Sequence, residues 1–403
     1  MRVLLVTSFP VPGEFDGTAM LPIKILRALR KRGVAVVLAH LRARPPWGKS
    51  ERGDFEGVPS FTFPATHWSR GLRQVARELP FDLVHAQHYG GATRAYAACR
   101  RNGWPMVYEI HSLLGEEVER RRLGRGLVFQ TYRALEQRVC KHAAAVIVLG
   151  EPVKRVLVEE KGVPEDRVSV IYPGIDLAEY AGPSRPAAIP GIGPEHKVVM
   201  YVGSIVHPNQ GVPILIEALP RVFSELPQAR CVLVGGPEEA AADYRARLGS
   251  FADRLIVLAG QTPEQVVSLT RRADVLVHAR LACRENYSVQ SKIAVYLASG
   301  RPIVATDFAD YSTLLGATGA GRLTAVNPAS VADGILEVLC NPSLAARLAA
   351  ATGPVAEEWF SMDRNIDRYL EVYDRALAIG RVRLSHQSKL SKSDRVAAGH
   401  WKS

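Results

Sequence analysis

Several signatures are missing from the 403-residue sequence, and each absence removes a class of protein. The five cysteines are scattered with no close pair, which argues against a disulfide framework and against a zinc site, so we expect each to be a small buried hydrophobe. No apolar run approaches the length needed to span a bilayer. The N-terminus lacks the apolar core and cleavage site of a secretory signal, and we therefore expect a cytoplasmic protein.

Nucleotide-binding glycine loops are also missing. The loop after the first apolar run contains only Gly13 and Gly17, and the run at 231–234 is followed by Gly235-Gly236-Pro237 without a third glycine. Because a dinucleotide site needs Gly-x-Gly-x-x-Gly at such a turn, nicotinamide chemistry is disfavoured. No Walker loop is present, which disfavours nucleotide hydrolysis, and no His, Asp and Glu cluster has metal-ligand spacing.

The charge that is present is basic and uneven. The chain carries +11 overall, and residues 1–180 carry 27 Lys and Arg against 19 Asp and Glu, giving +8. A basic N-terminal half favours an anionic partner or contact with an anionic membrane face. A merely solvated basic surface is an equal alternative.

Short apolar runs alternate with amphipathic stretches along the chain, which indicates an α/β fold with two doubly wound, Rossmann-like domains. Expected strands lie at 3–6, 35–38, 83–86, 106–110, 145–149, 168–171, 198–202, 231–234, 255–258, 275–278 and 303–305, and expected helices include 21–31, 93–101, 116–141, 153–160, 212–223 and 291–298.

The predicted domains are 1–180 and 181–360, joined through a Pro-rich linker at 182–194. A helix over 361–380 and a disordered basic tail over 381–403 should follow. Two such domains face each other across a cleft at the carboxyl ends of their strands, where helix N-termini favour a phosphate-bearing ligand.

Several segments in order resemble the retaining, nucleotide-sugar-dependent glycosyltransferases of the GT-B fold, the glycosyl transferases group 1 or family 4 type. They include "VYEIHSLLGEE" at 107–117, "VSVIYPGIDLAEY" at 168–180, "VVMYVGSIVHPNQGVPILIEAL" at 198–219 and "SKIAVYLASGRPIVATD" at 291–307. The resemblance implies that the N-terminal domain faces the acceptor and the C-terminal domain holds the donor. It also implies a final helix that crosses back to the first domain, and no metal or other cofactor.

The sequence departs from the pattern of these relatives at the donor site. The glutamate that binds the nucleotide ribose in them is replaced by Val295, and the glutamate before it by Tyr287, with Glu285 nearby. The diphosphate-binding Arg after Gly203 and Lys before Gly211 are replaced by Ser204 and Gln210. Since charge-assisted hydrogen bonds contribute roughly 1.5–3 kcal/mol each, this loss should weaken binding unless other cations substitute.

Substitutes are available close to the altered positions. The resemblance assigns Lys292 first, beside Ser291 at a helix start that itself favours phosphate. Arg280 and Arg284 follow the strand at 275–278, and either one is the second choice or a plain surface charge. His207 lies in the loop that should face the phosphates.

In the N-terminal domain, His111 follows a strand and matches a residue that contacts the transferred sugar or the acceptor in relatives; a structural histidine is the alternative. Gly17 should let the backbone approach the donor phosphates, or be a plain turn glycine. His85 and His88 should shape the acceptor side more than take part in catalysis.

The expected function is transfer of a sugar from a nucleotide diphosphate to an acceptor hydroxyl with retention, in polysaccharide, glycolipid or natural-product synthesis. His111 and Lys292 are the expected catalytic residues. The acceptor could be a glycan, a lipid-linked molecule or a small molecule, with peripheral contact at the inner membrane face and no nucleic acid. A non-catalytic GT-B scaffold that has lost the donor site is the main alternative, and a GT-B epimerase is a weaker one because no clear acid and base carboxylate pair is found.

Overall fold

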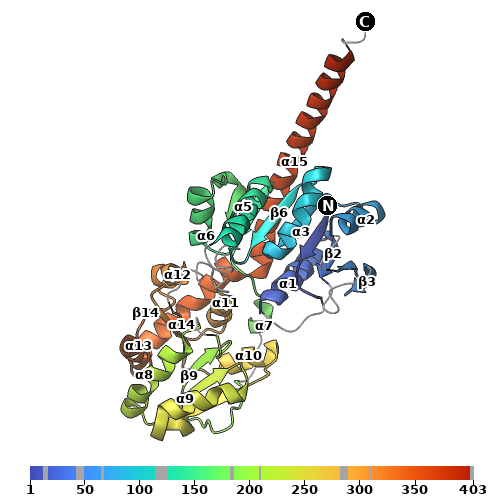
Figure 1. The fold of residues 1–403 in the computed structure, drawn as a ribbon. Helices are drawn as coiled ribbons and strands as arrows, with labels where there is room; N and C mark the ends of the chain where they lie inside the picture. The colour runs from blue at the N-terminus through green and yellow to red at the C-terminus, as the bar shows by residue number, and fades with distance from the viewer. Residues whose placement is uncertain are drawn as a thin grey trace. The chain divides into compact units, whose positions relative to one another are not determined.

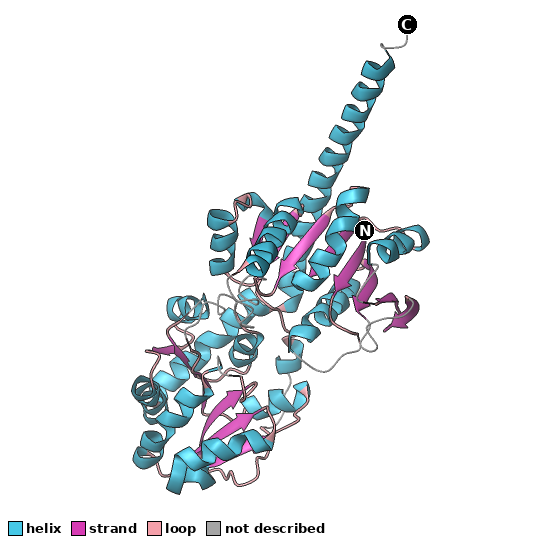
Figure 2. Cartoon of the chain, viewed as in Figure 1, coloured by secondary structure: helices cyan, strands magenta, loops and turns pink. Residues whose placement is uncertain are grey.

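The computed structural model describes residues 1–11, 17–41, 50–64, 68–113, 126–181, 186–207, 210–281, 289–308 and 310–399, with backbone only at 17–19, 128 and 381–399. The chain divides into two compact units. The N-terminal unit is Met1–Tyr172 together with Asn365–Ser403, and the C-terminal unit is Pro173–Arg364. Each unit is a twisted sheet with helices packed on it (Figures 1 and 2).

The sheet of the N-terminal unit has eight strands among the described residues, in the order β3-β4-β2-β1-β5-β6-β7-β8. Every neighbouring pair is parallel except β3 with β4. The central strands are buried along nearly their whole length, and most of their residues are apolar. The strands are β1 Arg2–Thr7, β2 Ala35–Leu41, β3 Glu51–Phe55, β4 Val58–Phe63, β5 Leu83–Gln87, β6 Met106–Ile110, β7 Ala145–Val148 and β8 Val168–Val170.

The helices of this unit connect successive parallel strands, and the last one comes from the far end of the chain. From Asn365 onward α15 belongs to the N-terminal unit, where Asn365 donates a hydrogen bond to the carbonyl of Tyr172 (2.9 Å) and Arg375 donates one to Ser169 Oγ (2.7 Å). The helices are α1 Gly17–Lys31, α2 Trp68–Glu78, α3 His88–Asn102, α5 Leu127–His142, α6 Glu151–Arg155 and α15 Met362–Gly399.

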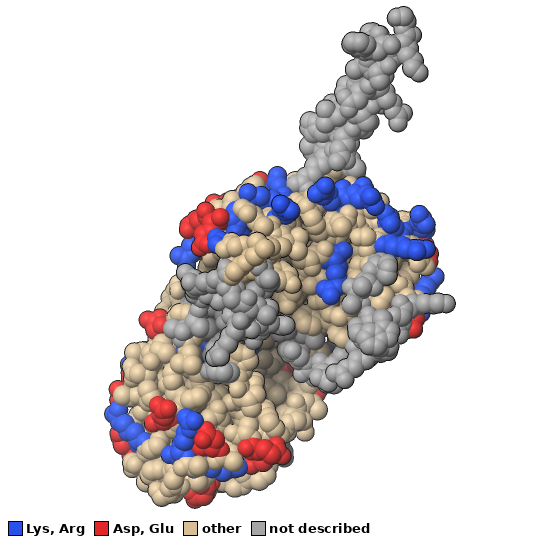
Figure 3. Space-filling model, viewed as in Figure 1, with Lys and Arg blue, Asp and Glu red and all other residues tan. Residues whose placement is uncertain are grey.

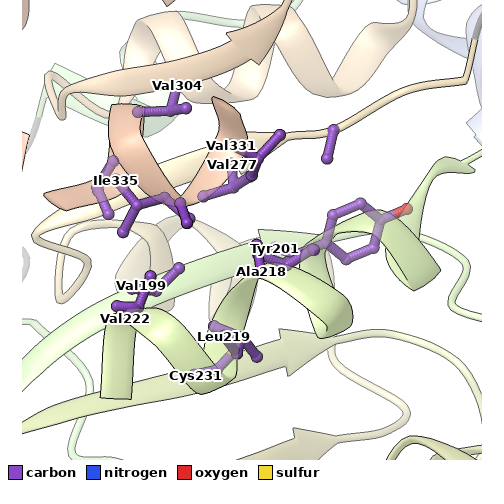
Figure 4. Close-up of a cluster of buried hydrophobic side chains, with 14 of the residues drawn as sticks. Val199, Tyr201, Ala218, Leu219, Val222, Cys231, Val277, Val304, Val331 and Ile335 are labelled. Carbon is purple, nitrogen blue, oxygen red and sulfur yellow. The ribbon is translucent and has the colours of Figure 1, made fainter. Parts of the chain in front are cut away.

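The C-terminal unit has a parallel sheet of six strands among the described residues, in the order β11-β10-β9-β12-β13-β14. Its core lies between this sheet and helices on one face, where Val199, Leu219, Val277 and Ile335 interdigitate (Figure 4). The strands are β9 Lys197–Val202, β10 Ala229–Val234, β11 Leu255–Leu258, β12 Val275–His278, β13 Ile303–Thr306 and β14 Arg322–Thr324.

Local capping fixes where several helices of this unit begin. Thr262 and Gln265 form a reciprocal capping box at α10, and Asn327 and Asn341 accept hydrogen bonds from the first turns of α13 and α14. The helices are α7 Ala178–Ala181, α8 Val212–Glu225, α9 Ala241–Leu248, α10 Pro263–Thr270, α11 Ser291–Ala298, α12 Asp310–Thr318, α13 Pro328–Cys340 and α14 Pro342–Val355.

Two expectations about local structure were wrong. The stretch after residue 380, expected to be a disordered tail, continues α15 as helix to Gly399. Cys340 is exposed at the end of α13, where it faces solvent instead of the core, whereas Cys99, Cys140 and Cys231 are buried as expected. Cys283 lies outside the described residues.

The surface charge differs between the two units. On the face shown in Figure 3, Lys and Arg side chains gather over the N-terminal unit, whereas the C-terminal unit carries both signs interspersed. This distribution agrees with the excess of basic residues in the first half of the sequence. Within the described residues, no helix combines the length and the apolar character needed to cross a bilayer.

Candidate active site

The strand order of the C-terminal unit reverses at β9, which has β10 on one side and β12 on the other. In open parallel sheets, ligands bind outside the carboxyl ends of the strands at such a reversal point. The residues that follow β9 and β12 are therefore the first place to look for a ligand site in this unit.

Glycines allow the loops at this edge to pack backbone against backbone. Gly203 and Gly211 have φ values of +135° and +70°, which side chains rarely allow. A Cβ added at Gly211 would lie 1.4 Å from the carbonyl oxygen of Ala279, and one at Gly203 would lie 2.5 Å from Lys292 Nζ. The loop after β9 therefore lies directly against the end of β12 and the start of α11.

Lys292 connects several of the residues at this edge of the sheet. Its Nζ donates hydrogen bonds to Gln210 Oε1 (2.6 Å) and to the hydroxyl of Tyr201 (2.8 Å), and it lies 4.3 Å from the centroid of the Tyr201 ring. The Tyr201 ring stands at the margin of the apolar core with its hydroxyl turned away from that core (Figure 4). This hydroxyl also donates to the carbonyl of Ser204 (3.0 Å), which ties the loop to the site.

The local electrostatics favour a negatively charged ligand. Desolvation, reinforced by the charge of Arg280, holds the pKa of Lys292 well below its usual range. His278, at the end of β12, is completely buried with its ring 4.7 Å from that of Tyr311; burial and then the charges of Lys292 and Arg280 lower its pKa. Arg280 is 7% exposed. Three basic side chains thus lie within electrostatic range of one another.

Helix α11 supplies Lys292 and is itself held firmly to the sheet. The Tyr296 hydroxyl accepts a hydrogen bond from the amide of Val202 (2.8 Å) and donates one to the carbonyl of Val277 (3.3 Å). Gln290 caps the helix without a side-chain hydrogen bond to its first turn, so backbone N–H groups there can meet an anion. Val295 lies three residues after Lys292 and hence on the same helix face.

The N-terminal unit has its own reversal point, between β1 and β5. A Cβ at Gly91 would lie 2.7 Å from the carbonyl oxygen of Val6, so α3 begins close against the end of β1. His88, the first residue of α3, has a φ of 59°, a left-handed conformation that costs a non-glycine residue free energy. Its ring lies 5.4 Å from that of Phe9 and 5.8 Å from that of His111.

A buried polar network lies directly beneath these rings. Gln87 and Glu109 are aligned in the parallel register of β5 and β6, and His85 is on the same face because side chains alternate along a strand. The fully buried Glu109 carboxylate accepts hydrogen bonds from Gln87 Nε2 and from the hydroxyl of Tyr369 in α15, both at 3.1 Å. His85 Nε2 and His111 Nε2 lie 2.9 and 3.3 Å from its two oxygens.

These contacts keep Glu109 ionised. Burial alone would raise the pKa of its carboxyl, but the hydrogen bonds and charges of His111 and His85 outweigh that effect and hold the pKa below its usual range. His85 therefore belongs to the interior of the unit, bonded on its other nitrogen to Tyr373 (2.7 Å), and does not shape a surface as we expected.

The structure brings some of the predicted site residues together. Gly203, Gln210, Arg280 and Lys292 meet at one sheet edge, whereas Ser204 contributes only its carbonyl oxygen there and Ser291 is exposed at the helix start. His111 lies apart from these residues, in the N-terminal unit, and the other predictions concern residues that lie outside the described ranges or next to them. Arg284, Glu285 and Tyr287 are not described, and Gly17 opens α1 just after the undescribed 12–16.

Several residues that interact with the predicted site residues were not identified from the sequence. Tyr201, His278 and Glu109 each lie inside or at the end of an apolar strand and received no role. A signal was present for Glu109, since a carboxylate in the run "MVYEI" of a strand expected to be buried requires partners. Among the described residues, no group of three or more His, Cys, Asp or Glu side chains is arranged to hold a metal ion.

Two family matches divide the chain much as the structure does. Residues 15–179 match Glycosyltransferase Family 4, and residues 196–341 match Glycosyl transferases group 1. The D-inositol 3-phosphate glycosyltransferase of Nocardia farcinica is 30% identical over 66% of this chain and 62% of its own length. The protein of that name from Mycolicibacterium smegmatis is 29% identical over 82% of this chain and 77% of its own length.

Solved structures agree on the fold. The Anabaena protein HepE, crystallised with UDP, aligns over 93% of this chain and 100% of its own, with a TM-score of 0.74 and 20% identity. Sucrose-phosphate synthase from Thermosynechococcus elongatus aligns over 94% of this chain and 99% of its own, with a TM-score of 0.72 and 16% identity. With glycosyltransferase families matching both halves and a Rossmann-like sheet in each unit, the chain belongs to the glycosyltransferases of the GT-B fold.

Proposed function

We propose that this glycosyltransferase takes its sugar from a nucleoside diphosphate sugar, that the diphosphate binds at Lys292, and that the transfer retains anomeric configuration. The observation that carries the donor site is the surroundings of the Lys292 ammonium. Its polar contacts in the described part of the chain, Tyr201 and Gln210, are both uncharged. A desolvated cation without a negative partner is unfavourable, and an anionic ligand would compensate it.

We interpret the positions that differ from the relatives as a rearranged donor site. Gln210 stands where relatives carry a cation, and it holds the Lys292 ammonium against the loop after β9. Lys292 and Arg280 thus supply positive charge from the other side of the same loop. Departure of the diphosphate in the reaction needs this charge, since little covalent assistance is required when the groups are well positioned.

The N-terminal unit would supply the acceptor side. His111, at the carboxyl edge of β6 beside His88, is the residue we expect to meet the transferred sugar or the acceptor hydroxyl. The acceptor class stays as broad as the sequence leaves it: a glycan, a lipid-linked molecule or a small molecule. The basic surface of this unit (Figure 3) makes contact with an anionic membrane face part of the proposal.

Calorimetric titration of the purified protein with UDP, GDP, TDP and their common sugars tests the donor site. One nucleotide should bind in the micromolar range, and Lys292→Ala should weaken it by about 10- to 100-fold, because a charge-assisted hydrogen bond contributes about 1.5–3 kcal/mol. Lys197→Ala is the matched control: this lysine of the same unit pairs with Asp274 (3.4 Å) and should leave binding unchanged.

A GT-B scaffold without a donor site is the competing function, favoured by Val295. This apolar side chain shares a helix face with Lys292 and offers no acceptor to a ribose diol. If no nucleotide binds at millimolar concentration, the scaffold is correct and the donor proposal is wrong. If a donor does bind, the anomeric configuration of the product, measured by NMR, decides between retention and inversion.

A further inference from the structure

Four polar side chains surround the Glu109 carboxylate. Gln87 Nε2 and His85 Nε2 lie at its Oε2, and the Tyr369 hydroxyl and His111 Nε2 lie at its Oε1. An ionised carboxylate can only accept, and it offers about four lone-pair positions. Gln87 and Tyr369 donate hydrogens to it, and at 2.9 and 3.3 Å it would repel a lone pair on the Nε2 atom of either histidine.

This repulsion favours one tautomer of each histidine. We expect His85 and His111 each to carry a proton on Nε2, the nitrogen that lies nearest Glu109. The surroundings of the other His85 nitrogen agree with this assignment, since Nδ1 lies 2.7 Å from the Tyr373 hydroxyl, which is able to donate to it. A neutral His111 with this tautomer has its lone pair on Nδ1, so Nδ1 is the ring atom with acceptor character.

We infer that Glu109 is a positioning residue for sugar transfer: it sets the tautomer and the ring orientation of His111, and α15 completes the arrangement through Tyr369. The inference rests on the proposed function, because His111 is the residue expected to meet the transferred sugar or the acceptor. The His111 side chain is 5% exposed, and the one beneath it, Glu109, is fully buried, so the support comes from the interior of the unit.

The position of the network argues for a role beyond stability. His111 comes two residues after Glu109, at the carboxyl edge where ligands bind in open parallel sheets. The strained backbone of His88 lies at the same edge, and such strain concentrates at functional sites. A carboxylate serving stability alone could equally be replaced by apolar side chains of similar volume.

Another buried carboxylate of the chain provides a control for substitutions of Glu109. Glu136 is a second buried carboxylate of the same unit, 1% exposed, and it pairs with Lys161 at 2.5 Å. Glu109→Ala and Glu136→Ala each remove a buried carboxylate, so both should lower stability. Only Glu109→Ala removes the acceptor that faces His111.

The tautomers can be read directly from the full-length protein. With ¹⁵N-labelled histidine, long-range ¹H–¹⁵N spectra distinguish Nε2–H from Nδ1–H, and His85→Asn and His111→Asn assign the two resonances. At a pH where the rings are neutral, the wild type should show Nε2–H for His111. Glu109→Ala should give a mixture of tautomers, and Glu136→Ala should leave the wild-type spectrum.

Turnover is measured with UDP-glucose as the probe, by release of UDP. Glu109→Ala should be slower than Glu136→Ala by about tenfold or more, which is the usual effect of removing a residue that orients a functional side chain. Glu109→Gln, which keeps one acceptor oxygen, should recover part of that loss. The Michaelis constant for UDP-glucose should stay unchanged, since the donor diphosphate is proposed to bind in the other unit.

Each outcome decides something different. A wild-type His111 with its proton on Nδ1, or equal turnover in Glu109→Ala and Glu136→Ala while His111→Ala is inactive, overturns the inference alone. A His111→Ala variant as active as the wild type overturns the proposed role of His111, and with it the catalytic part of the inference. Absence of UDP-glucose turnover in the wild type argues against this donor, and the tautomer then decides whether Glu109 positions His111.

Discussion

The pKa of Lys292 should depend on whether a ligand is bound. Without a ligand, desolvation and then the charge of Arg280 depress its pKa. A bound diphosphate favours the ammonium form and should raise the pKa again. Between the two pKa values, binding must take up a proton, and affinity must fall as the pH rises through that interval.

This proton uptake can be measured with UDP-glucose, by calorimetry in buffers that differ in ionisation enthalpy. The wild type should take up a fraction of a proton per bound donor at a pH between the two pKa values of Lys292, and Lys292→Ala should take up none. Lys197→Ala should behave as the wild type. Uptake that persists in Lys292→Ala would assign the titration to another group, such as His278 or Arg280, which interact electrostatically with Lys292.

Individual site residues could be predicted from the sequence only where a local pattern marks them. Lys292 was predicted because it stands at a helix start in a segment that resembles relatives, and the structure places it among Gly203, Gln210 and Arg280. The role of Glu109 could not be predicted, because Tyr369, one of its partners, lies 260 residues away in the sequence. Partners so distant become visible only when the fold is known.

At the scale of elements, Gly211 decides how closely the loop after β9 approaches β12. In Gly211→Ala, the new Cβ would overlap the Ala279 carbonyl oxygen at 1.4 Å, so the backbone must move. We expect the C-terminal unit to lose about 1–3 kcal/mol of unfolding free energy beyond the cost of the left-handed conformation itself. Donor binding should weaken as well, because Gln210 moves with the loop.

Gly300→Ala separates the cost of the left-handed backbone conformation from the cost of the steric overlap. Gly300 has nearly the same φ, +69°, but a Cβ there meets nothing within 4 Å. Urea unfolding of the two variants should therefore show a small loss for Gly300→Ala and a larger one for Gly211→Ala. Equal losses would mean that the loop relaxes freely and that the close approach is unimportant.

Strands that are buried on both faces could be predicted from the sequence more readily than exposed or very short strands. The strands expected at 3–6 and 198–202 are continuous apolar runs, and β1 and β9 lie there. The missed strands β3, β4 and β14 are at or beside the margins of their sheets. β3 is largely exposed and polar, and β14 has only three residues, so neither shows the pattern that a doubly covered strand requires.

For the whole molecule, the division into units predicts an asymmetry between fragments. Pro173–Arg364 is one continuous segment and should fold alone and bind the donor. Residues 1–172 lack α15, which leaves Glu109 without Tyr369 and His85 without Tyr373. We expect that fragment to unfold at lower urea concentration, and less cooperatively, than one in which residues 365–399 are joined to it through a short linker.

Circular dichroism of the three fragments checks this expectation. If residues 1–172 unfold as cooperatively without α15 as with it, the helix adds nothing essential to the N-terminal unit. If Pro173–Arg364 does not fold, the continuity of the chain within a unit is a poor guide to independent folding.

The return of α15 to the first unit also sets an order of events during synthesis. A ribosome that adds roughly 5–20 residues per second makes Tyr369 about 13 to 50 seconds after Glu109, once nearly all of the C-terminal unit has emerged. The N-terminal unit is therefore completed last, although most of its residues are synthesised first. A polypeptide released before residue 369 lacks the Tyr369 hydroxyl, so the Glu109 carboxylate is left one hydrogen-bond donor short.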